Sequence, residues 1–159
     1  MRWIWIDKFT HFESGVRATA VKNISLAEEH LHDHFPGYPV MPASLMVEGM
    51  AQTAGILVGE ARDFKEKVIL AKVKRAHFKR EVRPGERLTY DAHVEQITPE
   101  AAMTVGKITS DGEPIGEVDI VFSHIDNNLS GLQFPEENFV FTEDFKALLR
   151  TYNVERRGA

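Results

Sequence analysis

One segment constrains the fold more than any other, because residues 43–62 are apolar on nearly every side when drawn as a helix. The apolar side chains are not confined to one stripe: Leu45, Met46, Val47, Met50, Ala51, Ala54, Ile56, Leu57 and Val58. A helix that is apolar all round is buried rather than laid on a surface. Pro42 suits its first position, where the missing N–H would have no helical partner. We therefore expect a buried central helix from Ala43 to about Arg62.

The segments on either side of this helix have the pattern of strands. Residues 3–12 are rich in aromatic and β-branched side chains, and residues 16–24 alternate apolar and polar, which predicts a hairpin. Four further strand-like runs follow the helix, at 67–80, 87–97, 102–110 and 115–124. A hairpin, a buried helix and an antiparallel meander together predict an α+β domain with one sheet wrapped around one helix.

The last part of the chain has a different pattern. Residues 127–138 are loop-like, and residues 142–152 are typical of a short amphipathic helix capped by Thr142. We divide the chain into one domain over residues 1–126 and a C-terminal extension over residues 127–159.

The composition excludes several classes of protein. The 159 residues suit a single core, and the absence of cysteine excludes disulfides, a thiolate zinc site and a cysteine nucleophile. A net charge of -5 argues against nucleic-acid binding through overall basic charge. No apolar run approaches the roughly 20 residues of a membrane-spanning helix, and the N-terminal run is too short for a signal peptide. We expect a cytoplasmic protein without membrane insertion.

Two titratable residues have positions that suit catalysis. Glu48 lies in the apolar helix, where a carboxylate must be paired or hold a proton; it is either a satisfied buried acid or a proton donor near neutral pH. His34 opens a loop rich in proline and is either an ordinary loop histidine or a general base. A base and an acid on opposite sides of a substrate are what elimination of water requires. The N–H groups near Ala43, at the helix start, would stabilise an enolate-like oxygen.

Other kinds of site are less well supported. His30, His32 and His34 would face one way in an extended strand and would suit a metal, but a proline-rich loop is a poor metal scaffold. Ser44 lacks the flanking glycines of a nucleophile elbow, which argues against a serine hydrolase. We therefore predict no metal.

Basic residues gather in one stretch of this acidic chain. Only Glu81 and Glu86 oppose seven cations between residues 72 and 87: Lys72, Lys74, Arg75, Lys79, Arg80, Arg83 and Arg87. They form either a solvated strand face or a docking surface for an acidic partner.

Two blocks of the sequence resemble a known family. Residues 34–42 (HFPGYPVMP), followed by Glu48 and residues 50–52, closely resemble the signature of bacterial 3-hydroxyacyl-(acyl-carrier-protein) dehydratases of the FabZ type. A second block continues in the same order and spacing: Leu70-Ala71, Phe78-Lys79-Arg80 and Pro84-Gly85-Glu86. The resemblance covers roughly residues 1–125.

The resemblance implies a hot-dog fold, an antiparallel sheet wrapped around a long central helix, and homodimers that in some members assemble as trimers of dimers. It implies dehydration of (3R)-hydroxyacyl thioesters on acyl carrier protein to trans-2-enoyl thioesters in fatty acid biosynthesis, without a cofactor. The position of His34 is the general base, and that of Glu48, from the other subunit, is the general acid. Gly37, Ala43 and Gln52 match substrate-binding positions. The expected docking residues for carrier protein are Lys72, Lys74, Arg75, Lys79 and Arg80.

The sequence departs from the family pattern at a few places. Asp33 and Ala43 stand where the family usually has glycine, Glu81 replaces a usual proline, and the C-terminal extension is longer. These departures bear on substrate choice more than on reaction type. A hot-dog thioesterase and a non-catalytic acyl-thioester-binding module are the alternatives, and the presence of both His34 and Glu48 favours the dehydratase.

Overall fold

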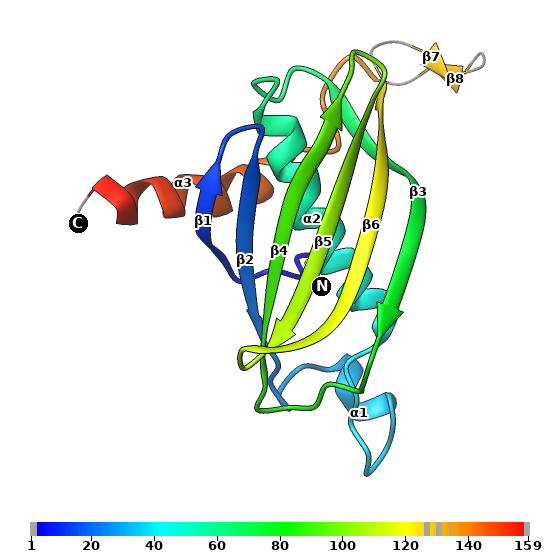
Figure 1. Ribbon diagram of the computed structural model, residues 1–159, viewed down its shortest axis with the longest axis vertical. Coiled ribbons are helices and arrows are strands. Elements are labelled where there is room, and N and C mark those ends of the chain that lie inside the picture. Colours follow the sequence, from blue (N-terminus) through cyan, green and yellow to red (C-terminus); the bar gives the residue numbers. More distant parts are fainter. Residues whose placement is uncertain (1–2, 126–127, 130–131, 134, 158–159) are drawn as a thin grey trace.

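The chain forms a six-stranded antiparallel sheet that curves around helix α2, as the computed structural model shows (Figure 1). The structure describes residues 3–125, 128–129, 132–133 and 135–157. In the sheet the strands follow the order β1-β2-β4-β5-β6-β3. Their bounds are Lys8–Glu13 (β1), Arg17–Asn23 (β2), Lys67–Phe78 (β3), Arg87–Ile97 (β4), Ala101–Ser110 (β5) and Glu113–Ile125 (β6).

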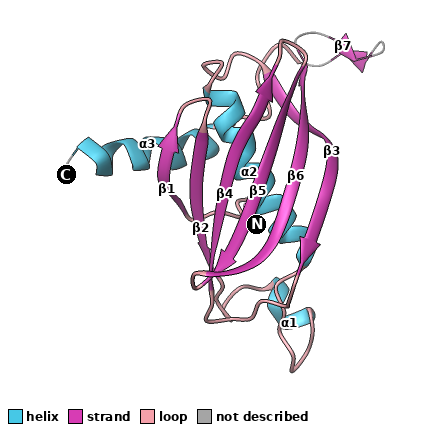
Figure 2. Cartoon of the chain, viewed as in Figure 1, coloured by secondary structure: helices cyan, strands magenta, loops and turns pink. Residues whose placement is uncertain are grey.

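The helices lie on one side of this sheet and at its ends (Figure 2). Helix α1 spans His30–Asp33, α2 spans Ala43–Glu60 and α3 spans Glu143–Arg157. Two short strands, Asn128–Leu129 (β7) and Leu132–Gln133 (β8), pair separately. Helix α3 packs against β1, so the described part of the extension lies against the rest of the chain. The α+β hot-dog arrangement expected from the sequence is confirmed.

Helix α2 supplies the centre of the core. Every residue from Gly49 to Gly59 is buried, as a helix apolar on all sides requires. The helix is less enclosed at its start, where Ala43 and Ser44 are exposed and Glu48 is half-buried. The expectation of burial along the whole helix is therefore wrong for its first turns. In the part of the chain that the structure describes, no helix is both long and apolar enough to cross a bilayer.

The predicted element bounds agree closely with the structure in the meander and less well at the ends of the chain. The predicted first strand is wrong over residues 3–7, which are coil and lie beside α2. Pro42 is the N-cap of α2 rather than its first residue. The loop predicted over residues 127–138 contains β7 and β8, and α3 continues five residues past the predicted end at 152, to Arg157.

Strand β3 forms an edge of the sheet, and among the described strands it pairs with β6 alone. Its residues 70–77 are exposed on both faces, including Leu70 (42% exposed) and Val73 (37%). Such an edge presents unpaired backbone N–H and C=O groups that suit pairing with another strand. A long exposed edge with apolar side chains therefore favours association with a second chain.

Two glycines of α2 make a matched stability test. An added Cβ at Gly49 would lie 2.5 Å from Cζ of the fully buried Tyr90, whereas one at Gly55 would make an ordinary 3.5 Å contact with Phe122. We expect Gly49→Ala to lower the free energy of unfolding by about 1–3 kcal/mol through overpacking. Gly55→Ala should be neutral or stabilising by up to about 1 kcal/mol, through helix propensity. Urea unfolding measures both; equal stabilities would contradict the close packing of Tyr90.

Candidate active site

The loop that carries His34 is held from several directions. The backbone N–H of Val40 donates to the His34 carbonyl at 2.8 Å, and the N–H of Met41 donates to the Val82 carbonyl at 2.8 Å. Gly37 has a φ of +73°, which places it in the left-handed region at the tip of the turn. These bonds close the loop on itself and fasten it to the segment after β3.

The side chain of Tyr38 fastens the same loop a second time. Its hydroxyl donates to the Glu81 carboxylate at 3.1 Å, and the Arg83 guanidinium lies 3.6 Å from the centre of its ring. Glu81 is one of the positions where this sequence departs from the FabZ pattern. The departure supplies an acceptor that ties the His34 loop to the neighbouring segment.

The hydrogen bond of the His34 ring determines its tautomer. Nδ1 lies 2.7 Å from the carbonyl oxygen of Val40. A carbonyl oxygen only accepts, so Nδ1 carries the proton of the neutral ring and Nε2 is left with its lone pair. The ring also stacks on Phe35 with centroids 4.3 Å apart. The half-buried imidazole is thus oriented with an accepting nitrogen, as a general base requires.

Glu48 accepts two hydrogen bonds on the same oxygen. The Trp3 indole N–H donates to Oε1 at 3.0 Å, and the Gln52 side-chain NH₂ donates to it at 2.9 Å. Gln52 in turn accepts from the Trp5 backbone N–H at 2.7 Å and donates to the Trp3 carbonyl at 3.1 Å. The coil at residues 3–7 is therefore held on α2 by Gln52, and it orients the Glu48 carboxylate.

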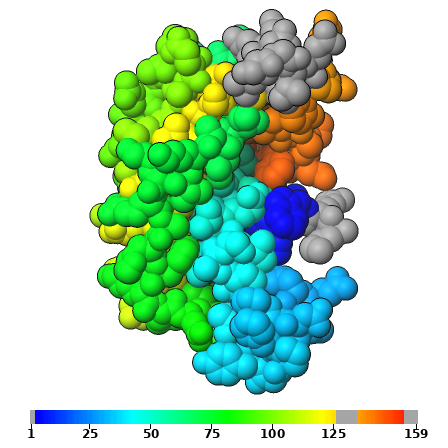
Figure 3. Space-filling view, turned by 90° about the vertical axis from the view of Figure 1, so that its right-hand side faces the viewer, coloured from blue at the N-terminus to red at the C-terminus, as the bar shows by residue number. Residues whose placement is uncertain are grey.

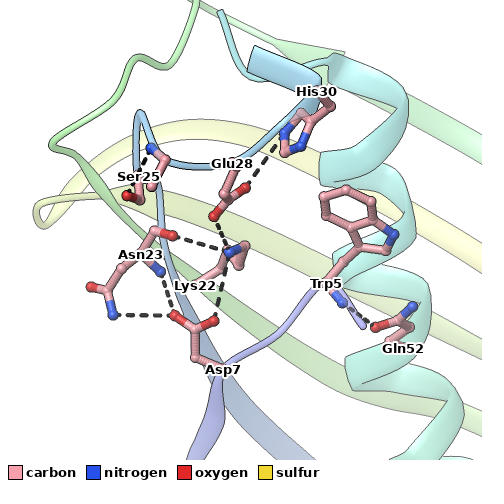
Figure 4. A network of polar contacts seen from close by, with 9 residues as sticks. Trp5, Asp7, Lys22, Asn23, Ser25, Glu28, His30 and Gln52 are labelled. Atoms are coloured by element: carbon pink, nitrogen blue, oxygen red, sulfur yellow. Dashed lines mark hydrogen bonds and ion pairs between the residues drawn. The ribbon is translucent and has the colours of Figure 1, made fainter. Parts of the chain in front are cut away.

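A second polar network fixes the other side of this N-terminal segment (Figure 4). Lys22 Nζ lies 2.5 Å from Glu28 and 3.6 Å from Asp7. His30 is 3.5 Å from Glu28 and packs edge-on against the Trp5 ring. Burial lowers the pKa of His30 more than the nearby Glu28 carboxylate raises it, so the imidazole is neutral at pH 7.

The three histidines around α1 do not converge on one point. His30 faces Glu28, His32 bonds the Leu26 carbonyl at 2.9 Å, and His34 bonds the Val40 carbonyl. They diverge because residues 30–33 are helical, whereas a shared face required an extended strand. Among the described residues no group of three or more acidic or histidine side chains could hold a metal ion.

Glu48 lies on the wall of an apolar cavity of about 290 Å³. The cavity runs between α2, β3 and the extension, and Figure 3 shows α2 in cyan between β3 in green and the N-terminal segment in blue. Its lining from the core domain is Trp3, Glu48, Ala51, Gln52, Gly55, Ile56, Val68, Ile69, Leu70 and Phe122. The extension adds Val140, Phe141 and Phe145. His34 is not part of the lining of this cavity.

Ala43 is the first residue of α2, and its side chain is exposed. The N–H groups of Leu45 and Met46 donate to the Pro42 carbonyl, at 3.0 and 3.2 Å. The first N–H groups of a helix have no partner within it, so the Ala43 N–H is oriented outward at the positive end of the helix dipole. This geometry suits an acceptor oxygen.

The predicted docking cations fall into two groups. Arg75 contacts Glu117 at 3.0 Å and Asp119 at 2.9 Å, both on β6, so its charge is compensated within the sheet. Lys72 and Lys74 are exposed on β3. The Lys74 ammonium lies 3.2 Å from the Met103 sulfur, and no carboxylate among the described residues pairs with it.

Arg80 is also paired, in a cluster beside the loop that follows it. It contacts Glu86 at 2.7 Å and Glu113 at 3.3 Å. Burial alone would raise the pKa of Glu86, but hydrogen bonds from Ser110, the Arg83 N–H and Arg80 outweigh it and hold the pKa below its usual value. The local positive excess expected from the sequence is therefore smaller on the surface.

Comparison with known proteins shows the family to which this chain belongs. A model of the FabA-like domain matches residues 3–119. The chain belongs to the FabA-like family. The match includes the His34 loop, α2 with Glu48 and the basic stretch, and it ends before the C-terminal extension.

Two curated relatives of this FabA-like protein share a name. The protein is 35% identical to a 3-hydroxyacyl-[acyl-carrier-protein] dehydratase FabZ from Listeria welshimeri over 122 residues, which are 76% of this chain and 85% of the relative. It is 36% identical to the FabZ of Oceanobacillus iheyensis, over 76% of this chain and 87% of that one. The resemblance to the FabZ type is confirmed.

Solved structures confirm the fold. The dehydratase heterocomplex ApeI:P from Xenorhabdus doucetiae matches with a TM-score of 0.65 at 13% identity, covering 77% of this chain and 84% of that chain. A thioesterase from Haemophilus influenzae matches with a TM-score of 0.60 at 14% identity, covering 74% and 76%. At these identities the likeness concerns the fold alone.

The sequence did not indicate two contributors to the site. Trp3 was assigned to a strand, yet its indole binds Glu48. Phe141 was assigned to the extension without a role, yet it lines the cavity. Both contacts join segments far apart in the chain, so no local spacing carries their signal.

Replacing Gln52 tests the link between α2 and the N-terminal segment. Gln52→Met keeps the volume but leaves the Trp5 N–H without its acceptor, and we expect a loss of about 1–3 kcal/mol in unfolding free energy. Thr53→Val is the control. The Thr53 hydroxyl donates to the Gly49 carbonyl at 2.8 Å, which already lies in the helix ladder, so its loss should cost under about 1 kcal/mol. Hydrogen exchange at the Trp5 amide should accelerate only in Gln52→Met; unchanged exchange there would disprove the link.

Proposed function

We propose that this FabA-like protein dehydrates (3R)-hydroxyacyl thioesters carried on acyl carrier protein to trans-2-enoyl thioesters, in cytoplasmic fatty acid biosynthesis. The observation that carries the proposal is the pair of oriented groups: an imidazole with a free Nε2 and a carboxyl group on the wall of an apolar cavity. The names of the curated relatives support the reaction and the carrier.

The chemistry follows from the two orientations. His34 Nε2 takes the proton from C2 of the substrate, and Glu48, as the protonated acid, gives its proton to the C3 hydroxyl, which leaves as water. The thioester oxygen gains negative charge in between, and the Ala43 N–H at the start of α2 stabilises it. Each cycle leaves a protonated His34 and an ionised Glu48, and proton exchange with solvent restores both. The reaction needs no cofactor.

The complete site requires a second copy of the chain. His34 is absent from the lining of the cavity that contains Glu48, and the first turns of α2 are only partly covered. The exposed edge of β3 suits pairing with the same strand of another subunit. We therefore assign His34 and Glu48 of each site to different subunits of a homodimer. Assembly of three such dimers is compatible with this arrangement.

Carrier protein docking is assigned to the uncompensated lysines of the basic stretch. Acyl carrier proteins are acidic, and charges at the rim of an interface mainly raise the association rate. Lys72, Lys74 and Lys79 are exposed and pair with no carboxylate of the described residues. They are better placed for this role than Arg75 and Arg80, which are paired with carboxylates of their own chain. Gly37 and Gln52 act on the substrate through the loop and the carboxylate that they position.

A mixing experiment tests the shared site. His34→Ala and Glu48→Gln should each lower kcat by about 10²- to 10⁴-fold while the dimer is preserved. When the two variants are unfolded together and refolded, half of the dimers are mixed, and each contains one native site. We expect recovery of about a quarter of native activity, measured by enoyl absorbance. If the mixture is no more active than the separate variants, both residues of a site lie on one chain. If either variant alone has normal turnover, the residue that it replaces has no part in the mechanism.

Charge reversal tests the docking assignment. Lys72→Glu and Lys79→Glu should lower kcat/KM for carrier-protein substrates severalfold at low salt and leave pantetheine thioesters unchanged, because the latter need only the cavity and the catalytic pair. The difference should shrink near 0.15 M salt, where the Debye length is about 8 Å. Lys107→Glu on β5 is the matched control, with the same change of charge on an exposed lysine. Equal losses for both substrate types would contradict a docking role.

A further inference from the structure

The far end of the cavity is built by residues outside the FabA-like match. That match ends at residue 119, whereas Val140, Phe141 and Phe145 line the cavity. Phe141 is only 4% exposed and belongs to the hydrophobic core. The extension, orange in Figure 3, lies along the same side of the molecule as the N-terminal segment. The wall that faces away from Glu48 is therefore supplied by the extension.

A glycine of α2 fixes the position of the Phe141 ring. An added Cβ at Gly59 would lie 2.3 Å from Cζ of Phe141, so the ring rests directly on the helix backbone. On its other side the ring packs edge-on against Phe64 at 5.0 Å between centroids. Phe141 is thus clamped between the last turn of α2 and the loop that follows it.

The backbone around Phe141 is fastened as firmly as its ring. The Asn138 side chain accepts from the N–H groups of Val140 and Phe141, at 3.1 and 3.2 Å. It donates to the carbonyls of Phe64 and Glu66, at 3.0 and 3.1 Å. One amide therefore joins the extension to the connection between α2 and β3, and the wall is a fixed part of the structure.

The spacing along α2 sets the free length of the cavity. Glu48 and Gly59 are eleven residues apart, which is about 16 Å along the helix axis. The Phe141 ring covers the Gly59 end and shortens this length. An extended chain advances about 1.2 Å per bond, because three backbone bonds span about 3.3–3.6 Å. The space beyond Glu48 therefore accommodates about ten to twelve bonds.

We propose that Phe141, supported by Val140 and Phe145, is the residue that limits the length of the acyl chain. The inference rests on the proposed dehydration, because it takes Glu48 as the point where the reacting carbons lie. The substrate class is hydroxyacyl thioesters of up to about 13 to 15 carbons, because the ten to twelve bonds beyond Glu48 follow C3 of the acyl chain. Longer chains meet the ring of Phe141 before C3 reaches Glu48.

The test compares chain-length profiles of the native protein and Phe141→Ala. We measure kcat/KM for 3-hydroxyacyl-pantetheine thioesters of 4 to 16 carbons. In Phe141→Ala the ratio of the 16-carbon to the 8-carbon value should rise at least about tenfold, the scale that methylenes in an apolar pocket support. Phe139→Ala is the matched control, a neighbouring phenylalanine that is 47% exposed and outside the lining, and should leave the ratio unchanged.

Two additions keep the outcomes separate. Phe141→Leu makes a smaller change in volume and replaces Phe141→Ala if the latter fails to fold. It should also raise the ratio of the 16-carbon to the 8-carbon value. Binding of saturated acyl-pantetheine thioesters, measured by calorimetry, gives a length profile without turnover. If the Phe141 variants bind longer chains but the protein shows no turnover, the proposed dehydration is rejected and the role of Phe141 in limiting chain length is retained. Turnover with an unchanged profile in both Phe141 variants would reject Phe141 as the limit.

Discussion

The structure depends on one requirement, the cover of a helix that has no polar side. The sheet covers only one side of α2, and a fully buried side chain such as Leu57 or Ile56 stabilises the fold by roughly 1.5–3 kcal/mol. Other segments of the chain must therefore cover the remaining sides. The N-terminal segment covers the middle of the helix, and Phe141 covers its last turn. The cavity is the part of this cover that remains open. Glu48, the proposed acid, lies where this cover is incomplete.

The sequence predicted the elements whose pattern is local. The meander was placed within a few residues, because alternation along β4, β5 and β6 reflects the two faces of each strand. The same reasoning failed at residues 3–7. Their composition is typical of a strand, but the Gln52 side chain, 47 residues from Trp5 along the chain, binds their backbone instead. A side-chain acceptor so distant in sequence leaves no mark on local periodicity.

The sequence likewise predicted one part of the candidate site and missed another. His34 and Glu48 were predicted from residue type and motif, and the structure adds the tautomer of one and the donors of the other. The basic stretch shows what residue counting misses. Arg75 lies opposite Asp119 in the register of β3 and β6, so its charge is compensated by a partner 44 residues away. The charge of a segment predicts a surface potential only after the register of its neighbours is known.

The proposed roles of Glu48 and Phe141 are coupled through water. In a single chain Glu48 is half-buried, and the cavity beside it is open. An acyl chain that fills this cavity would displace water from one side of the carboxyl group, and the second subunit of the proposed dimer would cover the first turns of α2. Removing water strengthens the interactions of Glu48 with its indole and amide donors and with the leaving hydroxyl. A chain too short leaves water beside the acid, and one too long holds C3 away from it. The proposed wall would therefore also determine how much water remains beside Glu48. Length selection and proton transfer, as proposed, both depend on the contact between Phe141 and Gly59.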